Sequence, residues 1–161
     1  MKMKFFALAL SLMLMITGSA LAESYYSNLM NLPADSVDQA KAAVIAQLPQ
    51  AVIDHAQLDY DDRRLEWDIF YTRDGMLGVC EVNAETYKVI RTKEYPSAEG
   101  ALTAAKAIEA LKQAKGNLTI VDIDLDRDDG RIVYEGEAEL DGRFYEFEMT
   151  VDGQIIEWER D

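Results

Sequence analysis

The sequence contains two similar halves, and this internal doubling constrains the fold more than any single motif. Each half has a helix-like segment, an alternating strand, an Asp-Gly pair and a second acidic-apolar strand. The pairs Asp74-Gly75 and Asp141-Gly142 stand 67 residues apart, as do Trp67 and Tyr134. The doubling predicts two copies of one small fold.

A helix is predicted at the start of each half. Ser36 is placed to cap the first helix, Gln39 completes a capping box, and Pro49 ends the helix. Pro96-Ser97 opens the second helix and Gly116-Asn117 closes it. Apolar residues follow helical spacing at Val37, Ala40, Val44, Ile45 and Leu48, and again at Leu102, Ala105, Ile108 and Leu111.

Period-two alternation predicts antiparallel strands with one apolar and one acidic face. The pattern runs through residues 65–71, 132–140 and 145–151, and a further strand is predicted before each hairpin, at 53–60 and 119–126. A unit of roughly 60 to 65 residues buries barely enough surface to be stable alone. The predicted fold class is therefore α+β, with two helix-plus-three-stranded antiparallel sheet repeats packed as one compact body.

Four segments are expected along the chain. Residues 1–22 read as a signal peptide, because Lys2 and Lys4 precede a short apolar stretch and Ala20-Leu21-Ala22 fits a cleavage site. Residues 23–34 form a lead-in, 35–95 the first repeat and 96–161 the second. The apolar stretch is too short to span a bilayer, so we expect an exported protein, periplasmic or secreted, without membrane insertion.

The charge balance limits the expected partners. The chain has 30 acidic and 16 basic residues, and loss of Lys2 and Lys4 with the signal peptide leaves 14 basic residues. Such a chain repels nucleic acid and anionic lipid, so neither is an expected partner. It attracts a cationic partner or divalent cations, although an acidic surface also serves solubility alone.

The residues that catalysis uses most often are scarce. Cys80 is the single cysteine and His55 the single histidine, so neither an internal disulfide nor a zinc cluster is predicted. Cys80 shares a strand face with Val82 and reads as a small buried hydrophobe. The sequence also lacks a Gly-rich phosphate loop and a Gly-x-Ser-x-Gly elbow. We therefore predict no enzyme, no catalytic residue, no cofactor and no metal ligand.

Two features leave alternatives open. Counted from Asp124, acids stand at positions 1, 3, 5 and 12 of a calcium loop, but Asp129 occupies the position that requires glycine. A solvated acidic strand face that ends in a turn explains the same pattern. Phe70 and Phe144 fall on the polar strand faces, where an aromatic side chain either anchors a partner or is covered by the other repeat.

The ends of the two units carry a family resemblance. Residues 79–90 and 145–156 each contain an alternating strand, a turn and a short strand that begins with a branched residue. Together with the Ala-rich helix at 101–115, this pattern resembles the PepSY family, in two tandem copies. In the first copy Tyr87 stands where the family has glycine, so that turn takes another shape or bears strain.

The resemblance implies an exported, non-enzymatic binding module. PepSY units occur in the propeptides of thermolysin-like metallopeptidases and in free-standing exported proteins, and no catalytic residues are attributed to them. The implied partner is a protein, such as an extracytoplasmic peptidase that is inhibited or chaperoned, or another envelope protein. The alternative is an acidic exported protein that binds calcium or another cation.

Overall fold

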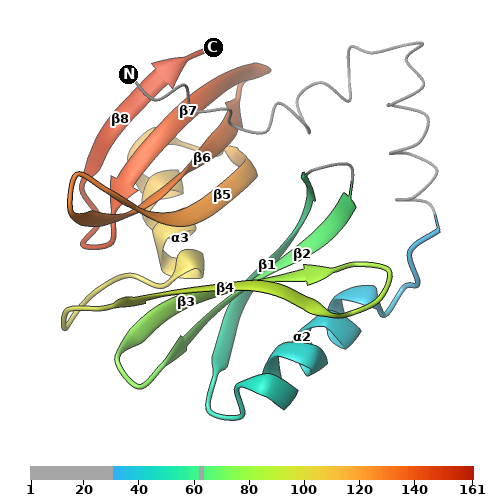
Figure 1. Ribbon diagram of the computed structural model, residues 1–161. Coiled ribbons are helices and arrows are strands. Elements are labelled where there is room, and N and C mark those ends of the chain that lie inside the picture. The colour runs from blue at the N-terminus through green and yellow to red at the C-terminus, as the bar shows by residue number, and fades with distance from the viewer. Residues whose placement is uncertain (1–30, 62–63) are drawn as a thin grey trace.

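The computed structural model describes residues 31–61 and 64–161 and has an α+β fold with two helices and two four-stranded antiparallel sheets (Figure 1). The first helix, α2 (Ser36–Gln47), precedes a sheet of β1 (Val52–Asp61), β2 (Arg64–Arg73), β3 (Met76–Asn83) and β4 (Val89–Pro96). The second, α3 (Ala104–Lys115), precedes a sheet of β5 (Thr119–Asp128), β6 (Arg131–Leu140), β7 (Arg143–Thr150) and β8 (Ile155–Arg160). The predicted signal peptide lies outside the described residues. No helix within them is long and apolar enough to cross a membrane.

Each sheet has four strands, so the prediction of three was wrong. The additional strands, β4 and β8, each occupy one edge of a sheet. In β4, four of the eight residues are exposed, including Arg91 and Thr92. An edge strand buries little of its surface, so the alternation that identified the other strands is weak there. The predicted boundary between the repeats, at residues 95 and 96, falls within β4.

The Asp-Gly hairpin turns are confirmed. Both residues have positive φ in Asp74-Gly75 (48° and 73°) and in Asp141-Gly142 (52° and 71°), as the tight turn requires. Asp129-Gly130 forms a third such turn, between β5 and β6. Tyr87 has a φ of 54°, so the turn that lacks the family's glycine does hold a non-glycine residue in a strained conformation.

The predicted cap of the first helix and the predicted start of the second were wrong. Ser36 is buried, and its hydroxyl accepts a hydrogen bond from Trp67 Nε1 at 2.8 Å instead of capping α2. Gln39 instead donates to the side chain of Asp35, the residue at the N-cap. In the second unit α3 begins at Ala104, because the backbone and side chain of Ser97 both bond the Gly75 carbonyl and tie β4 to a hairpin turn.

One apolar cluster joins the two units, and another lies within the first unit. On one face of the first sheet, α2 packs with Ala40 and Val44 against a cluster that contains Ile69 and Cys80. The opposite face contributes Phe70, Leu77 and Val79 to a second cluster, which includes α3 and the inner face of the second sheet. The first sheet is thus covered on both faces, and α3 lies between the two sheets (Figure 1). Phe70 is therefore a residue of the core between the units and not an exposed anchor.

Candidate functional site

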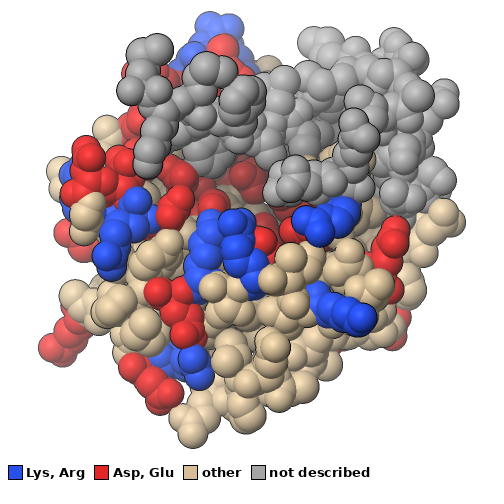
Figure 2. All heavy atoms as spheres, in the orientation of Figure 1, with Lys and Arg blue, Asp and Glu red and all other residues tan. Residues whose placement is uncertain are grey.

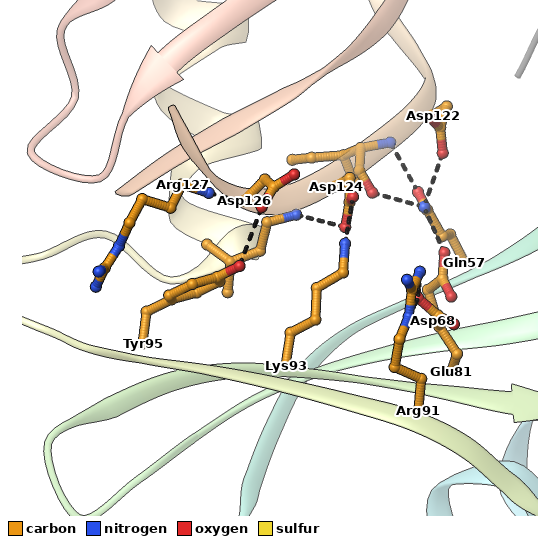
Figure 3. Close-up of polar contacts among 12 residues, drawn as sticks. Gln57, Asp68, Glu81, Arg91, Lys93, Tyr95, Asp122, Asp124, Asp126 and Arg127 are labelled. Carbon is orange, nitrogen blue, oxygen red and sulfur yellow. Dashed lines mark hydrogen bonds and ion pairs between the residues drawn. The ribbon is translucent and has the colours of Figure 1, made fainter. Parts of the chain in front are cut away.

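The polar contact between the two units is centred on Gln57, in β1 (Figure 3). Its side-chain amide pairs with the backbone of Ile123 in β5: Nε2 donates to the carbonyl oxygen at 2.7 Å, and Oε1 accepts from the N–H at 3.2 Å. Because β5 is an edge strand, its outward backbone groups need partners from outside the second sheet. Gln57 satisfies these groups as a neighbouring strand would.

Two largely buried aspartates meet the same amide group. Gln57 Nε2 lies 2.9 Å from Asp122 Oδ1 and 3.2 Å from Asp68 Oδ2. Burial, followed by the carboxylate of Asp59, raises the pKa of Asp68 to about 8 and that of Asp122 to about 7. The pair therefore holds a proton near neutral pH.

Strand β4 supplies further polar contacts to β5. Lys93 Nζ bonds Asp124 Oδ2 at 2.7 Å, and the Tyr95 hydroxyl donates to Asp126 Oδ1 at 3.0 Å. Burial, followed by this hydrogen bond, raises the pKa of Tyr95 to about 12. We refer to the residues that join β5 to the first sheet as the seam: Gln57, Asp68, Lys93 and Tyr95 from the first unit, and Asp122, Asp124 and Asp126 from β5.

The first unit also caps the helix of the second. Asp54 lies where the β1–β2 register shifts, and its Oδ2 accepts a hydrogen bond from the N–H of Ala105 at 2.9 Å. Thr103, which occupies the N-cap position of α3, makes no side-chain cap bond. Free N–H groups and the helix dipole favour a carboxylate at this end of a helix. The start of α3 thus depends on a residue about 50 positions earlier in the chain.

Replacing Asp54 by alanine is expected to lower the free energy of unfolding by about 1 kcal/mol, because the first turn of α3 loses its cap. Asp54→Asn keeps an acceptor but not the charge, so its loss is expected to be smaller. Urea unfolding measures both. The matched control is Thr103→Ala, which removes no cap bond and is expected to stay within about 0.5 kcal/mol of the parent. A larger loss for Thr103→Ala than for Asp54→Ala would contradict the assignment.

The outer face of the second sheet carries two rows of four carboxylates, with one from each strand. The register places these side chains directly opposite one another across neighbouring strands. Like charges directly opposite one another destabilise a sheet. Acidic side chains are gathered over this sheet at the upper left of Figure 2. We call these residues the acidic face: Asp124, Glu135, Glu148 and Glu157 in one row, and Asp122, Glu137, Glu146 and Glu159 in the other.

The segment that matched a calcium loop forms a hairpin. Asp124 and Asp126 lie in β5, where they bond Lys93 and Tyr95, and Glu135 lies opposite Asp124 in β6. The alternative interpretation, a solvated acidic strand face that ends in a turn, holds in part: Asp129-Gly130 forms the turn, but β5 directs Asp124 and Asp126 to the first unit. Over residues 31–61 and 64–161, no group of three or more His, Cys, Asp or Glu side chains is arranged to hold a metal ion.

The single cysteine, Cys80, and the single histidine, His55, both serve as packing residues. Cys80 is fully buried, and its Sγ lies 3.3 Å from Thr92 Oγ1. Burial raises the pKa of its thiol, which disfavours the nucleophilic thiolate. The His55 ring lies 5.7 Å from that of Phe70, and burial lowers its pKa. Cys80 is thus a buried hydrophobe, as predicted.

The comparisons bear on the second unit. Residues 101–159 match the PepSY family model, described as the peptidase propeptide and YPEB domain. No curated protein matches the chain significantly.

Several solved structures share a coarse likeness. A candidate lipoprotein from Clostridium difficile 630 is 16% identical with a TM-score of 0.43, covering 78% of this chain and 92% of its own. A BLIP-like protein from Bacteroides fragilis is 12% identical with a TM-score of 0.31, covering 76% and 84%. The YpeB C-terminal domain of Bacillus megaterium is 13% identical with a TM-score of 0.36, covering 78% and 63%. These three TM-scores lie below 0.5, and the likeness carries no functional argument. From just before α3 to near the end of β8, the chain is similar to PepSY domains.

Proposed function

We propose that this chain is an exported, non-enzymatic binding module that holds a basic surface of a protein partner on its acidic face. The observation that carries the proposal is the pair of carboxylate rows. Each row sets acidic side chains opposite one another, and because Glu135 and Glu148 are buried, an opposing basic surface meets the accessible carboxylates at the β7 and β8 side of the rows. Glu146 and Glu159 are exposed on this face and available to a partner. The PepSY match over residues 101–159 supports a binding role over a catalytic one.

The partner class that we propose is an extracytoplasmic peptidase, which the module inhibits or chaperones. The family description, peptidase propeptide, supports this choice. The signal peptide predicted at residues 1–22 supports export of the chain.

We also propose that residues 35–95 are a divergent copy of the unit at 96–161. Both have one helix followed by four strands in sequence order. The register shifts near Asp54 in β1 and near Val121 in β5, which are 67 residues apart, the same offset as the Asp-Gly hairpins.

The test is a triple variant, Glu146→Gln, Glu157→Gln and Glu159→Gln, with immobilised polylysine as the probe. Binding is expected to weaken about tenfold at low salt, because three face charges are lost. The matched control removes three exposed acids elsewhere, through Asp38→Asn, Glu85→Gln and Glu99→Gln. Equal losses for the two triple variants would show that net charge, and not the acidic face, attracts cations.

Two further measurements separate the partner classes. A thermolysin-like metallopeptidase is expected to cleave a peptide substrate more slowly with the exported protein present, and less so with the triple variant. An unaffected peptidase would contradict the peptidase assignment and leave the polylysine result standing. If calcium raises the melting temperature and the triple variant loses that rise, the cation-binding alternative is supported instead.

A further inference from the structure

We propose that the seam is a pH-sensitive fastening between the two sheets, closed while Asp68 or Asp122 carries a proton and loosened once both are ionised. It does not rest on the proposed function, because its groups join the two units of this chain to each other, although Asp122 and Asp124 also belong to the acidic face (Figure 3).

The hydrogen-bond count favours a proton on one of the two carboxyl groups. Gln57 Nε2 has two hydrogens but three acceptors within hydrogen-bond distance: the Ile123 carbonyl at 2.7 Å, Asp122 Oδ1 at 2.9 Å and Asp68 Oδ2 at 3.2 Å. The carbonyl takes one hydrogen, so one remains for two carboxyl groups. A proton on either carboxyl supplies a further donor. With both ionised, two desolvated like charges face one hydrogen.

The surrounding charges reinforce this effect. Asp59 in β1 and Asp124 in β5 raise the pKa values of both carboxyls. The register adds Glu81 opposite Asp68 and Glu137 opposite Asp122. The cations facing the seam from β4 bond other carboxylates: Lys93 bonds Asp124, and Arg91 bonds Glu81. Ionising the pair therefore adds negative charge to a region that is already acidic.

The direction of the pH effect follows from the raised pKa values. The folded chain holds protons on Asp68 and Asp122 up to about pH 8 and 7, whereas the unfolded chain releases them near the ordinary value of 3.8. The folded state therefore binds more protons between these limits, and stability falls as pH rises through that window. The contribution is complete below about pH 4 and is lost by about pH 8.

Thermal melts of the exported protein at pH 5, 7 and 9, at constant ionic strength, test the proposal. The melting temperature is expected to fall by about 5 °C or more from pH 5 to pH 9. The double variant Asp68→Asn and Asp122→Asn is expected to lose most of that fall. Glu146→Gln, an exposed acid on the acidic face, is the control and should retain it. A double variant that keeps the parent's fall would overturn the proposal.

A second measurement on the unmodified protein guards against a variant that does not fold. The Ile123 N–H, which bonds Gln57 Oε1, is expected to lose hydrogen-exchange protection between pH 6 and pH 9. The Val151 N–H, which bonds the Ile132 carbonyl within the second unit, should keep its protection. Unchanged protection of Ile123 would overturn the proposal. So would a calcium-dependent recovery of the melting temperature at pH 9 that the double variant lacks, because the pair would then be a cation site.

Discussion

Replacing Phe70 by alanine is expected to lower the free energy of unfolding by about 3–5 kcal/mol, the usual cost of removing a buried aromatic ring. Phe70 is 2% exposed, and it lies on the face of the first sheet that packs against the second unit. Its cluster includes Leu77 from β3 and Leu111 from α3. The variant leaves a cavity between the two units. Urea unfolding should show the full loss of stability.

Phe144→Ala is the matched control for Phe70→Ala. Phe144 is the other aromatic residue that the sequence places on a polar strand face, but it is only partly buried, and it lies opposite Glu139 near the end of the β6–β7 hairpin. Phe144→Ala is expected to lower the free energy of unfolding by less than half as much as Phe70→Ala. Equal costs would show that Phe70 has no special part in joining the units.

The strands that the sequence predicted are those whose signal is local. Alternation from Leu65 to Tyr71 requires only that one sheet face be apolar, and Asp74-Gly75 requires only a tight turn. Each signal lies within about ten consecutive residues. It can therefore be recognised without knowledge of the tertiary fold. The edge strands β4 and β8 show no clear alternation because little of their surface is buried, so only the family pattern indicated a short strand at these positions. The cap of α2 and the start of α3 were misplaced because tertiary bonds engage Ser36 and Ser97.

The seam could not be predicted, because its burial comes from packing between units distant in sequence. Asp68 alternates with apolar residues and reads as a solvated side chain, yet the second unit covers it. Gln57 lies in the segment with the poorest alternation, where a register shift between Ile53 and His55 breaks the period-two pattern. The poor alternation was the sequence signal at this site, and it did not reveal what covers the strand.

Replacing Gly136 by alanine is expected to lower the free energy of unfolding by about 3 kcal/mol, the upper part of the usual range for overpacking. A Cβ there would meet backbone atoms of β5: it would fall inside contact distance of the Asp122 carbonyl oxygen, 2.8 Å from the carbonyl carbon and 2.9 Å from Ile123 Cα. The register shift between Ile120 and Asp122 marks this irregular pairing. In a strand with free space at this position, replacing glycine by alanine would slightly raise the free energy of unfolding.

The clash at Gly136 also reaches the seam, since Asp122 and Ile123 are the β5 residues that bond Gln57. The variant is therefore expected to weaken the pH dependence of the melting temperature, which a loss of stability elsewhere would leave in place. Gly142→Ala is the control: its φ is 71° and no atom lies within 4 Å of the added Cβ, so only backbone strain of about 1 kcal/mol is expected. If Gly136→Ala cost no more than Gly142→Ala in urea unfolding, the β5 backbone would be free to move away from β6. Gln57 would then be joining the first unit to a strand with no fixed position, and the seam could not act as a fastening.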